Sequence, residues 1–282
     1  MGRLGKLFGT TAKEWFGDGA FDRSAILAYC AVFSIAPLLI IVTFFVALFH
    51  KGDTIAEVRV QFADFVSPQV AEVIAKGVVN AGFSPGRNIL YTCFAGLAMI
   101  VGASAFTYEL QRAVDAMWRL APRKGKRHML LRRLWTLVLG VGMGIFLQLS
   151  VLLNSEASAY RDYVNEAVPW FVHVWHWIDN GSAFLMIAVI YCLSYKLLPR
   201  VRVAWVDAAK AAIVSSVLFV MGRWVVALYV LPGGSTSVYG AAGSLMVLLT
   251  WLYYCSLVFL FGAKFTKISA DQRAEHQRTV NP

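Results

Sequence analysis

Six long apolar runs constrain this 282-residue chain more than any other feature of its sequence. Each run approaches or exceeds the roughly 20 residues that an α-helix needs to cross a lipid bilayer. Inside a bilayer there is no water to bind unpaired peptide groups, so such runs must fold as helices. The runs cover approximately residues 25–49, 88–108, 134–153, 178–198, 211–231 and 238–263.

The composition supports the same class of protein. The chain is 59% hydrophobic and only 15% charged, with a mean hydropathy of +0.62, whereas soluble domains carry about 25% charged residues. We therefore expect an all-α, multi-pass membrane protein with a six-helix transmembrane domain over residues 25–263. A polar segment, residues 1–24, precedes this domain, and a polar tail, residues 264–282, follows it. We expect the end of the tail to be disordered.

The distribution of Lys and Arg predicts the orientation in the membrane. Twenty of the 26 basic residues lie in the segments on one side of the six spans, and five lie on the other side. Loops rich in Lys and Arg stay in the cytoplasm. Both termini are therefore expected inside. The basic segments are residues 1–24, 109–133, 196–210 and 264–282.

Two loops have recognisable patterns of their own. In the outer loop, residues 50–87, apolar residues recur at helical spacing around Ser67-Pro68, which predicts two short amphipathic helices. The cytoplasmic loop, residues 109–133, is expected to begin as a salt-bridged helix end or to act as a cytoplasmic gate. The basic stretch of this loop either serves only to keep the loop in the cytoplasm or also binds anionic lipid headgroups. It lacks interleaved aromatic residues, so we expect no nucleic-acid binding. The candidate lipid contacts are Arg123, Lys124, Lys126, Arg127, Arg132 and Arg133.

Arg223 is the charged residue within the fifth run. An ion inside a membrane is costly, and it commonly faces the interior of a helix bundle or a water-filled cavity. Three roles stay open for Arg223: a structural ion, a residue of a ligand pathway, and a side chain that extends to the membrane surface. No carboxylate is expected at the same depth, so its partner would be a carbonyl, a hydroxyl, water or an anionic ligand.

Other candidate pathway residues lie near a proline that interrupts a helix or in a stretch of small residues. Pro37 near the middle of the first span frees a backbone carbonyl and kinks the helix, and Ser34 and Tyr29 lie close to it in sequence. The sixth span opens on a small-residue stretch that includes Tyr239, Gly240 and Gly243. Small residues of this kind let helices approach closely in lipid. The sequence predicts no metal site and no cofactor.

Three motifs in order resemble a known family. They are "AILAYCAVFSIAPLLII" in the first span, "LQRAVDAMWR" after the second, and "SVYGAAGSLMVLLTWLYYCSLVFLFGAKFT" in the sixth. Together they resemble the YihY/BrkB family of bacterial inner-membrane proteins over roughly residues 20–270. The resemblance implies six helices in the cytoplasmic membrane. It also implies a link to virulence or serum resistance, or to export of lipids or small solutes.

Two departures from the family pattern concern charge. Members typically carry Glu where this chain has Lys264, and they often carry Asn where it has Asp115. If the two positions touch in relatives, the charges have been exchanged here. We therefore predict an ion pair between Asp115 and Lys264 on the cytoplasmic side.

Transport of an amphipathic or anionic substrate is the function that these features favour. The alternative is a non-transporting scaffold that binds anionic lipids and supports the cell envelope. The family has also carried a ribonuclease label, but hydrolysis of this kind needs clustered metal ligands, and the histidines here are scattered on both sides of the membrane. We expect no enzymatic activity. The histidines are His50, His128, His173, His176 and His276.

Overall fold

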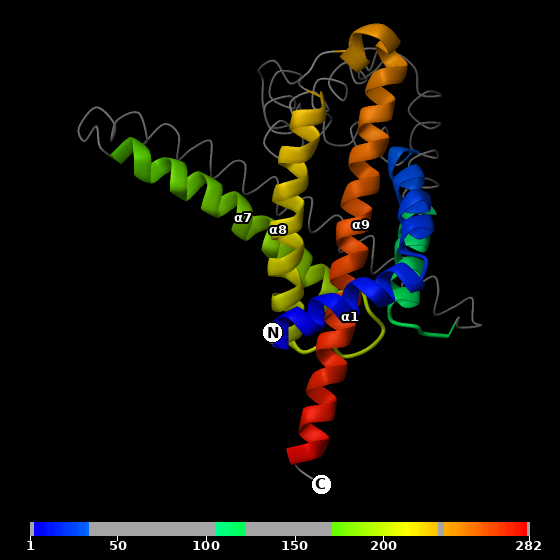
Figure 1. Cartoon of the computed structure of the whole chain (residues 1–282), viewed down its shortest axis with the longest axis vertical. Coiled ribbons are helices and arrows are strands. Elements are labelled where there is room, and N and C mark those ends of the chain that lie inside the picture. The colour runs from blue at the N-terminus through cyan, green and yellow to red at the C-terminus, as the bar shows by residue number, and fades with distance from the viewer. Residues whose placement is uncertain (1–2, 34–104, 122–170, 231–233, 281–282) are drawn as a thin grey trace, which may run out of the picture.

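The computed structural model of the chain describes residues 3–33, 105–121, 171–230 and 234–280. Within these residues all regular structure is helical, and none of them forms a β-strand. This part of the chain therefore has the predicted all-α class (Figure 1). The helical segments are α1 (Arg3–Gly17), residues 20–33, residues 105–117, α7 (Phe171–Leu197), α8 (Trp205–Val230) and α9 (Gly234–Val280).

Helices α7, α8 and α9 contain the fourth, fifth and sixth predicted spans. Among the described residues, Trp205–Val225 and Met246–Glu275 are long and apolar enough to cross a membrane, and Phe184–Leu197 is a shorter apolar stretch. Many of their large apolar side chains are exposed. An apolar surface of this extent fits lipid better than water. The exposed side chains include Leu185, Ile213, Val217, Met221, Trp224 and Met246.

Most of the other predicted features lie outside the described residues. The span 134–153 and the outer loop 50–87 fall there completely. Residues 25–33 of the first span and 105–108 of the second are described, and they are helical. Helix α1 and the C-terminal part of α9 both lie in the lower half of Figure 1. Six spans and cytoplasmic termini stay predictions.

A buried tyrosine joins the three long helices where they converge. The hydroxyl of Tyr195 in α7 lies 2.8 Å from Ser215 Oγ in α8 and donates to the carbonyl of Phe259 in α9 at 3.2 Å. Interhelical hydrogen bonds and small residues hold helices together in lipid, where apolar surface alone does not. Gly262 supplies the small residue, because a Cβ atom there would lie 2.1 Å from the side-chain oxygens of both Tyr195 and Ser215.

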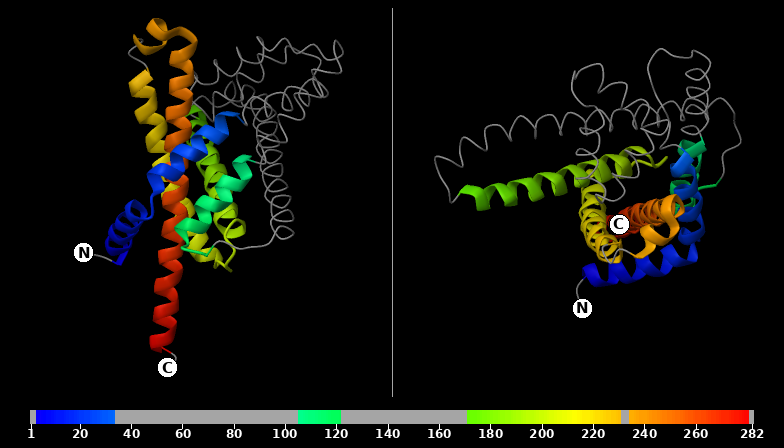
Figure 2. Two further views of the ribbon diagram at one scale, coloured as in Figure 1. Left: turned by 90° about the vertical axis from the view of Figure 1, so that its right-hand side faces the viewer. Right: turned by 90° about the horizontal axis from the view of Figure 1, so that it is seen from above.

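Helix α1 lies across α9 instead of running parallel to it, and Figure 2 shows the crossing from two further sides. Leu7, Thr11 and Trp15 recur every fourth residue and are buried, so they form one face of the helix. This face packs on α9, where the Trp15 ring meets Phe261 at 5.7 Å. The polar N-terminal segment of the sequence is thus an amphipathic helix docked on the bundle.

The C-terminal tail is helical through Val280, and its last two residues lie outside the described residues, so the expected disorder at its end stays a prediction. Helix α9 continues without a break to Val280. Asp207 at the start of α8 explains why the first part of the tail is ordered. Its Oδ1 atom accepts a hydrogen bond from Ser269 at 2.7 Å and an ion pair from Arg273 at 3.0 Å. These contacts tie the tail to the first turn of α8.

Gly262→Ala should destabilise the protein by about 1–3 kcal/mol, the usual cost of inserting a methyl group into a filled core. The added Cβ would displace the Tyr195 and Ser215 oxygens from their hydrogen bond. The free energy or midpoint of unfolding of the purified protein in detergent measures this. Gly9→Ala is the matched control, because a Cβ at Gly9 on α1 meets nothing within 4 Å. Equal unfolding midpoints for the two variants would contradict the role of Gly262.

Candidate functional site

The buried amine of Lys264 is the centre of the candidate site. Lys264 lies on α9, and its side chain has no exposed surface. A buried ammonium group must find charged or hydrogen-bonding partners, because leaving it unpaired is very costly. Its Nζ atom lies 2.5 Å from Asp18 Oδ2 and 2.8 Å from Glu14 Oε2, and it donates to the carbonyl of Met117 at 3.2 Å.

The two carboxylates come from the C-terminal end of α1 and the turn that follows it. Glu14 and Asp18 are four residues apart, so they project on the same side of the chain. Gly19 comes next and has φ of 69°, a left-handed conformation that glycine adopts without strain. This turn ends α1 and starts the helix over residues 20–33. It leaves both carboxylates directed at α9.

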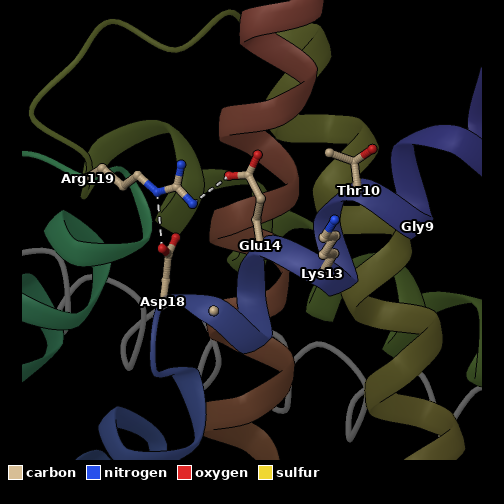
Figure 3. A pocket seen from close by; sticks show the side chains of 7 residues that line it. Gly9, Thr10, Lys13, Glu14, Asp18 and Arg119 are labelled. Carbon is tan, nitrogen blue, oxygen red and sulfur yellow. Dashed lines mark hydrogen bonds and ion pairs between the residues drawn. The ribbon is translucent and has the colours of Figure 1, made fainter.

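Arg119 contacts the same two carboxylates from the outer side. Its Nε atom lies 3.1 Å from Asp18 Oδ1, and its Nη2 atom lies 3.2 Å from Glu14 Oε2 (Figure 3). The Arg119 side chain is 53% exposed, in contrast to Lys264. We call Glu14, Asp18, Arg119 and Lys264 the Lys264 cluster. Two negative and two positive charges make it neutral overall, which limits the cost of burying its inner half.

The backbone of Arg119 is unusual and explains how its side chain reaches the cluster. Arg119 has φ of 52°, which costs a residue with a Cβ on the order of 1–2 kcal/mol. Arg119 ends the helix over residues 105–117 in a Schellman motif. The amide of Arg119 donates to the carbonyl of Ala116 and the amide of Leu120 donates to the carbonyl of Asp115, both at 2.9 Å. Glycine usually occupies this position of a helix end. The ion pairs to α1 are a physical reason for arginine here.

The cluster changes the acidity of its members. The hydrogen bond from Lys264 holds the pKa of Glu14 below its usual value. Burial alone would raise the pKa of Asp18, but its bonds to Lys264 and Arg119 outweigh this effect and lower it. The same carboxylates, Asp18 first, raise the pKa of Arg119. All three groups are therefore held in their charged forms at neutral pH.

An open hollow of about 570 Å³ lies beside the exposed edge of the cluster. In Figure 3, Thr10 and Lys13 project from α1 on the same side as Glu14. A hollow with cationic groups at its edge has the chemistry to receive an anionic group. The residues that line it are Gly9, Thr10, Lys13, Glu14, Gly17, Asp18 and Arg119.

Further ion pairs join the remaining helices at the same end of the bundle. Asp115 Oδ2 lies 2.5 Å from Arg200 Nη2, which follows α7. Lys196 in the last turn of α7 donates to the carbonyl of Val203 and stands 5.1 Å above the ring of Trp205. Charged contacts thus connect the ends of α1, α7, α8 and the helix over residues 105–117 with one another and with α9.

The structure gives Asp115 and Lys264 other partners, and the pair predicted between them stays a prediction. Both residues lie at this end of the bundle, as expected, but the structure pairs Lys264 with Glu14 and Asp18, and Asp115 with Arg200. The reason is reach: α1 crosses α9 at Lys264 and delivers two carboxylates there. Sequence reasoning missed both. A signal was available, because acidic side chains four residues apart at the end of a helix repel each other and oppose the helix dipole.

The predicted pathway residues are only partly described. Arg223 is exposed on α8, beside the exposed Trp224 and Val225, and so lies outside the packed junction of the long helices. Tyr29 is 62% exposed, and its ring contacts Phe33 at 4.8 Å. A pathway through these residues stays a prediction. Tyr239, Gly240 and Gly243 lie on α9, but their surroundings are outside the described part, as are Ser34, Pro37 and the basic stretch from Arg123 to Arg133.

Metal binding has no support in this part of the chain. In residues 3–33, 105–121, 171–230 and 234–280, no three His, Cys, Asp or Glu side chains gather in a way that could hold a metal ion. The chemistry of the site is therefore that of its charged side chains.

Comparison with known proteins finds many relatives of the same kind. The chain matches the family described as "Virulence factor BrkB" over residues 11–282. It is 25% identical to a UPF0761 membrane protein of Saccharophagus degradans, over 97% of this chain and 61% of that protein. It is also 23% identical to a UPF0761 membrane protein of Cronobacter sakazakii (89% of this chain, 84% of that one). A third relative, from Pseudoalteromonas translucida, is 26% identical (90% and 82%).

The chain thus spans about three fifths of the Saccharophagus protein and most of the other two. No solved structure matches the chain.

Removing both carboxylates of the cluster should destabilise the protein much more than removing them together with Lys264. Glu14→Gln with Asp18→Asn leaves the ammonium of Lys264 buried without a countercharge, and breaking a buried pair in this way costs about 3–5 kcal/mol. Adding Lys264→Met to these two substitutions should restore most of the loss, because methionine fills a similar volume without charge. Unfolding of the purified variants in detergent measures both effects. A triple variant no more stable than the double variant would show that Lys264 needs no carboxylate partner.

The same cluster predicts the response to acid. Because the pKa values of Glu14 and Asp18 are lowered in the folded protein, their contribution to stability is present above their unfolded values. It is lost as pH falls through the folded values. The unfolding temperature of the wild type should therefore drop more steeply below about pH 5 than that of the Glu14→Gln, Asp18→Asn, Lys264→Met variant. Parallel pH profiles for the two proteins would contradict this assignment.

Proposed function

The chain belongs to the family described as virulence factor BrkB, as its motifs predicted, and from this premise we propose that it transports or exports an amphipathic or anionic substrate across the bacterial inner membrane. The substrate class is a lipid or a small solute. Membership of the family and the names of the relatives establish a membrane protein. The transport activity, the inner membrane and the inward-facing termini belong to the proposal.

The Lys264 cluster is the observation that carries the proposal. It closes one end of the bundle by joining three separate pieces of chain: α1, the helix end at Arg119, and α9. The contacts among its four side chains are ion pairs, which can break and re-form without unfolding a helix. A closure of this type can open when another partner satisfies the buried amine.

An anionic substrate can supply that partner. Its phosphate or carboxylate would replace Glu14 or Asp18 at Lys264 and Arg119, where the geometry already suits two carboxylate groups. The hollow beside the cluster lies next to Arg119 and Lys13, so an anion can reach these two cations first. We therefore assign the cluster the role of a cytoplasmic gate, in agreement with the basic character of this side of the protein.

A second function is favoured by a different observation. Arg223 is exposed on α8 among exposed apolar side chains, which suits contact with lipid headgroups by a long side chain better than a place on an internal path. This supports a non-transporting scaffold that binds anionic lipids through Arg223 and through the basic stretch from Arg123 to Arg133. Neither function requires an enzyme, and we propose none.

A reversible crosslink across the proposed gate tests the proposal. Asp18→Cys and Arg119→Cys, in a protein whose four native cysteines are changed to serine, would be bridged by a short, reducible bifunctional thiol reagent. A bridge is needed because arginine is long, and two cysteines at these positions are not expected to meet the distance for a direct disulfide. The protein is reconstituted in vesicles that contain phosphatidylglycerol. Movement of a fluorescent phosphatidylglycerol and of carboxyfluorescein is then followed.

We expect movement of one probe in the reduced protein, its loss after bridging, and its recovery after reduction. The unbridged variant in the same vesicles is the control for folding, since it has the same sequence. Equal rates before and after bridging would remove the gate role from the cluster. Failure of both probes to move with the folded wild type would favour the scaffold.

A further inference from the structure

Helix α1 presents more aromatic surface than the bundle covers. Phe16 is 62% exposed, Phe8 is 40% exposed and Phe21, just beyond the helix, is 38% exposed. The rings of Phe16 and Phe21 stack on each other at 5.2 Å, and Trp15 lies 5.1 Å from Phe16 and 5.0 Å from Phe21. Three phenylalanines on one short segment form an apolar patch that water does not favour.

The residues of α1 divide into ordered rows around the helix. Phe8, Ala12 and Phe16 recur every fourth residue and form a row beside the buried row. Lys6 and Lys13 are exposed and lie roughly 110° further round the helix from the phenylalanine row, by the geometry of 3.6 residues per turn. Amphipathic helices that lie in a membrane surface place basic side chains on their polar face and aromatic ones on the apolar face.

Contacts with α9 fix which way the aromatic row faces. Phe8 packs on Phe261 at 5.6 Å and on Phe265 at 5.7 Å, while Glu14 pairs with Lys264. Trp15 also meets Phe261. The aromatic side of α1 is thus in contact with the apolar, membrane-spanning part of α9. The hollow lies along another side of α1, where Thr10 and Lys13 line it.

The orientation of α1 in the molecule agrees with these contacts. Helices α8 and α9 run along the long axis of the molecule, and α1 lies across them (Figures 1 and 2). If α8 and α9 cross a bilayer, then α1 lies close to the plane of its surface, at the level of Lys264. The charged cluster at that level suits the boundary between lipid chains and water.

From these observations we propose that α1 docks on the cytoplasmic surface of the lipid bilayer. Phe8, Phe16 and Phe21 enter the boundary between headgroups and acyl chains, and Lys6 and Lys13 reach anionic phosphates. Two lysines beside an apolar row complement an anionic lipid surface in a way that an apolar protein partner would not require. This inference requires a membrane protein but does not require transport.

The test uses the full chain, without native cysteines, in vesicles of phosphatidylcholine and phosphatidylglycerol. A nitroxide spin label is placed by Phe16→Cys, by Phe21→Cys or by Lys13→Cys. Labels in lipid collide more often with oxygen, and labels in water collide more often with a polar nickel complex. We expect the ratio of oxygen to nickel collisions at positions 16 and 21 to exceed that at position 13 by roughly threefold or more.

The control position, Lys13, lies on the same helix, so a label there reports on α1 whether or not the aromatic row is in lipid. High nickel access at positions 16, 21 and 13 alike would overturn the proposal, because α1 would then lie in water. Low access to both oxygen and nickel at position 16 would also overturn it, since protein would cover the row. Spin–spin broadening in that case would identify a second copy of the chain as the cover.

Discussion

The buried ammonium of Lys264 is the constraint on which the described structure most depends. A lysine without exposed surface cannot remain charged unless countercharges reach it, and here they come from α1, nearly the whole chain length away in sequence. This requirement fixes where α1 crosses α9. It also gives a physical reason for the left-handed backbone of Arg119, whose side chain balances the second negative charge.

The long helices follow a different rule, because lipid removes the hydrophobic drive for helices to associate. Contact between α7, α8 and α9 therefore centres on a buried tyrosine, a serine and a glycine that permits close approach. Many of their large apolar side chains are exposed on the outside, where lipid can cover them. The polar junction lies beside the Lys264 level of α9, since Gly262 and Lys264 are two residues apart. The close helix packing at Gly262 and the ion pairs of Lys264 therefore lie in the same turn of α9.

Local sequence was sufficient to predict the long helices, but it was insufficient to predict which side chains pair with Lys264. The apolar runs predicted spans within α7, α8 and α9, and the positions of Asp115 and Lys264 at one end were correctly inferred. The partners were not, because Glu14 and Asp18 reach Lys264 only through the crossing of α1 over α9, which no local pattern encodes. The helical tail escaped prediction for a similar reason: its order rests on Asp207, more than 60 residues earlier in the chain.

The two proposals are connected through α1. This helix and the turn after it supply Glu14 and Asp18 to the buried amine, and the helix also carries the exposed phenylalanine row that we propose enters lipid. Any anion that replaces those carboxylates at Lys264 weakens the hold of α9 on α1, and any change in how α1 binds the membrane alters the position of its carboxylates. Coupling between two binding events is reciprocal, so an anion at the cluster and an anionic lipid under α1 affect each other equally. A gate built on an interfacial helix therefore responds to the charge of the membrane in which it lies.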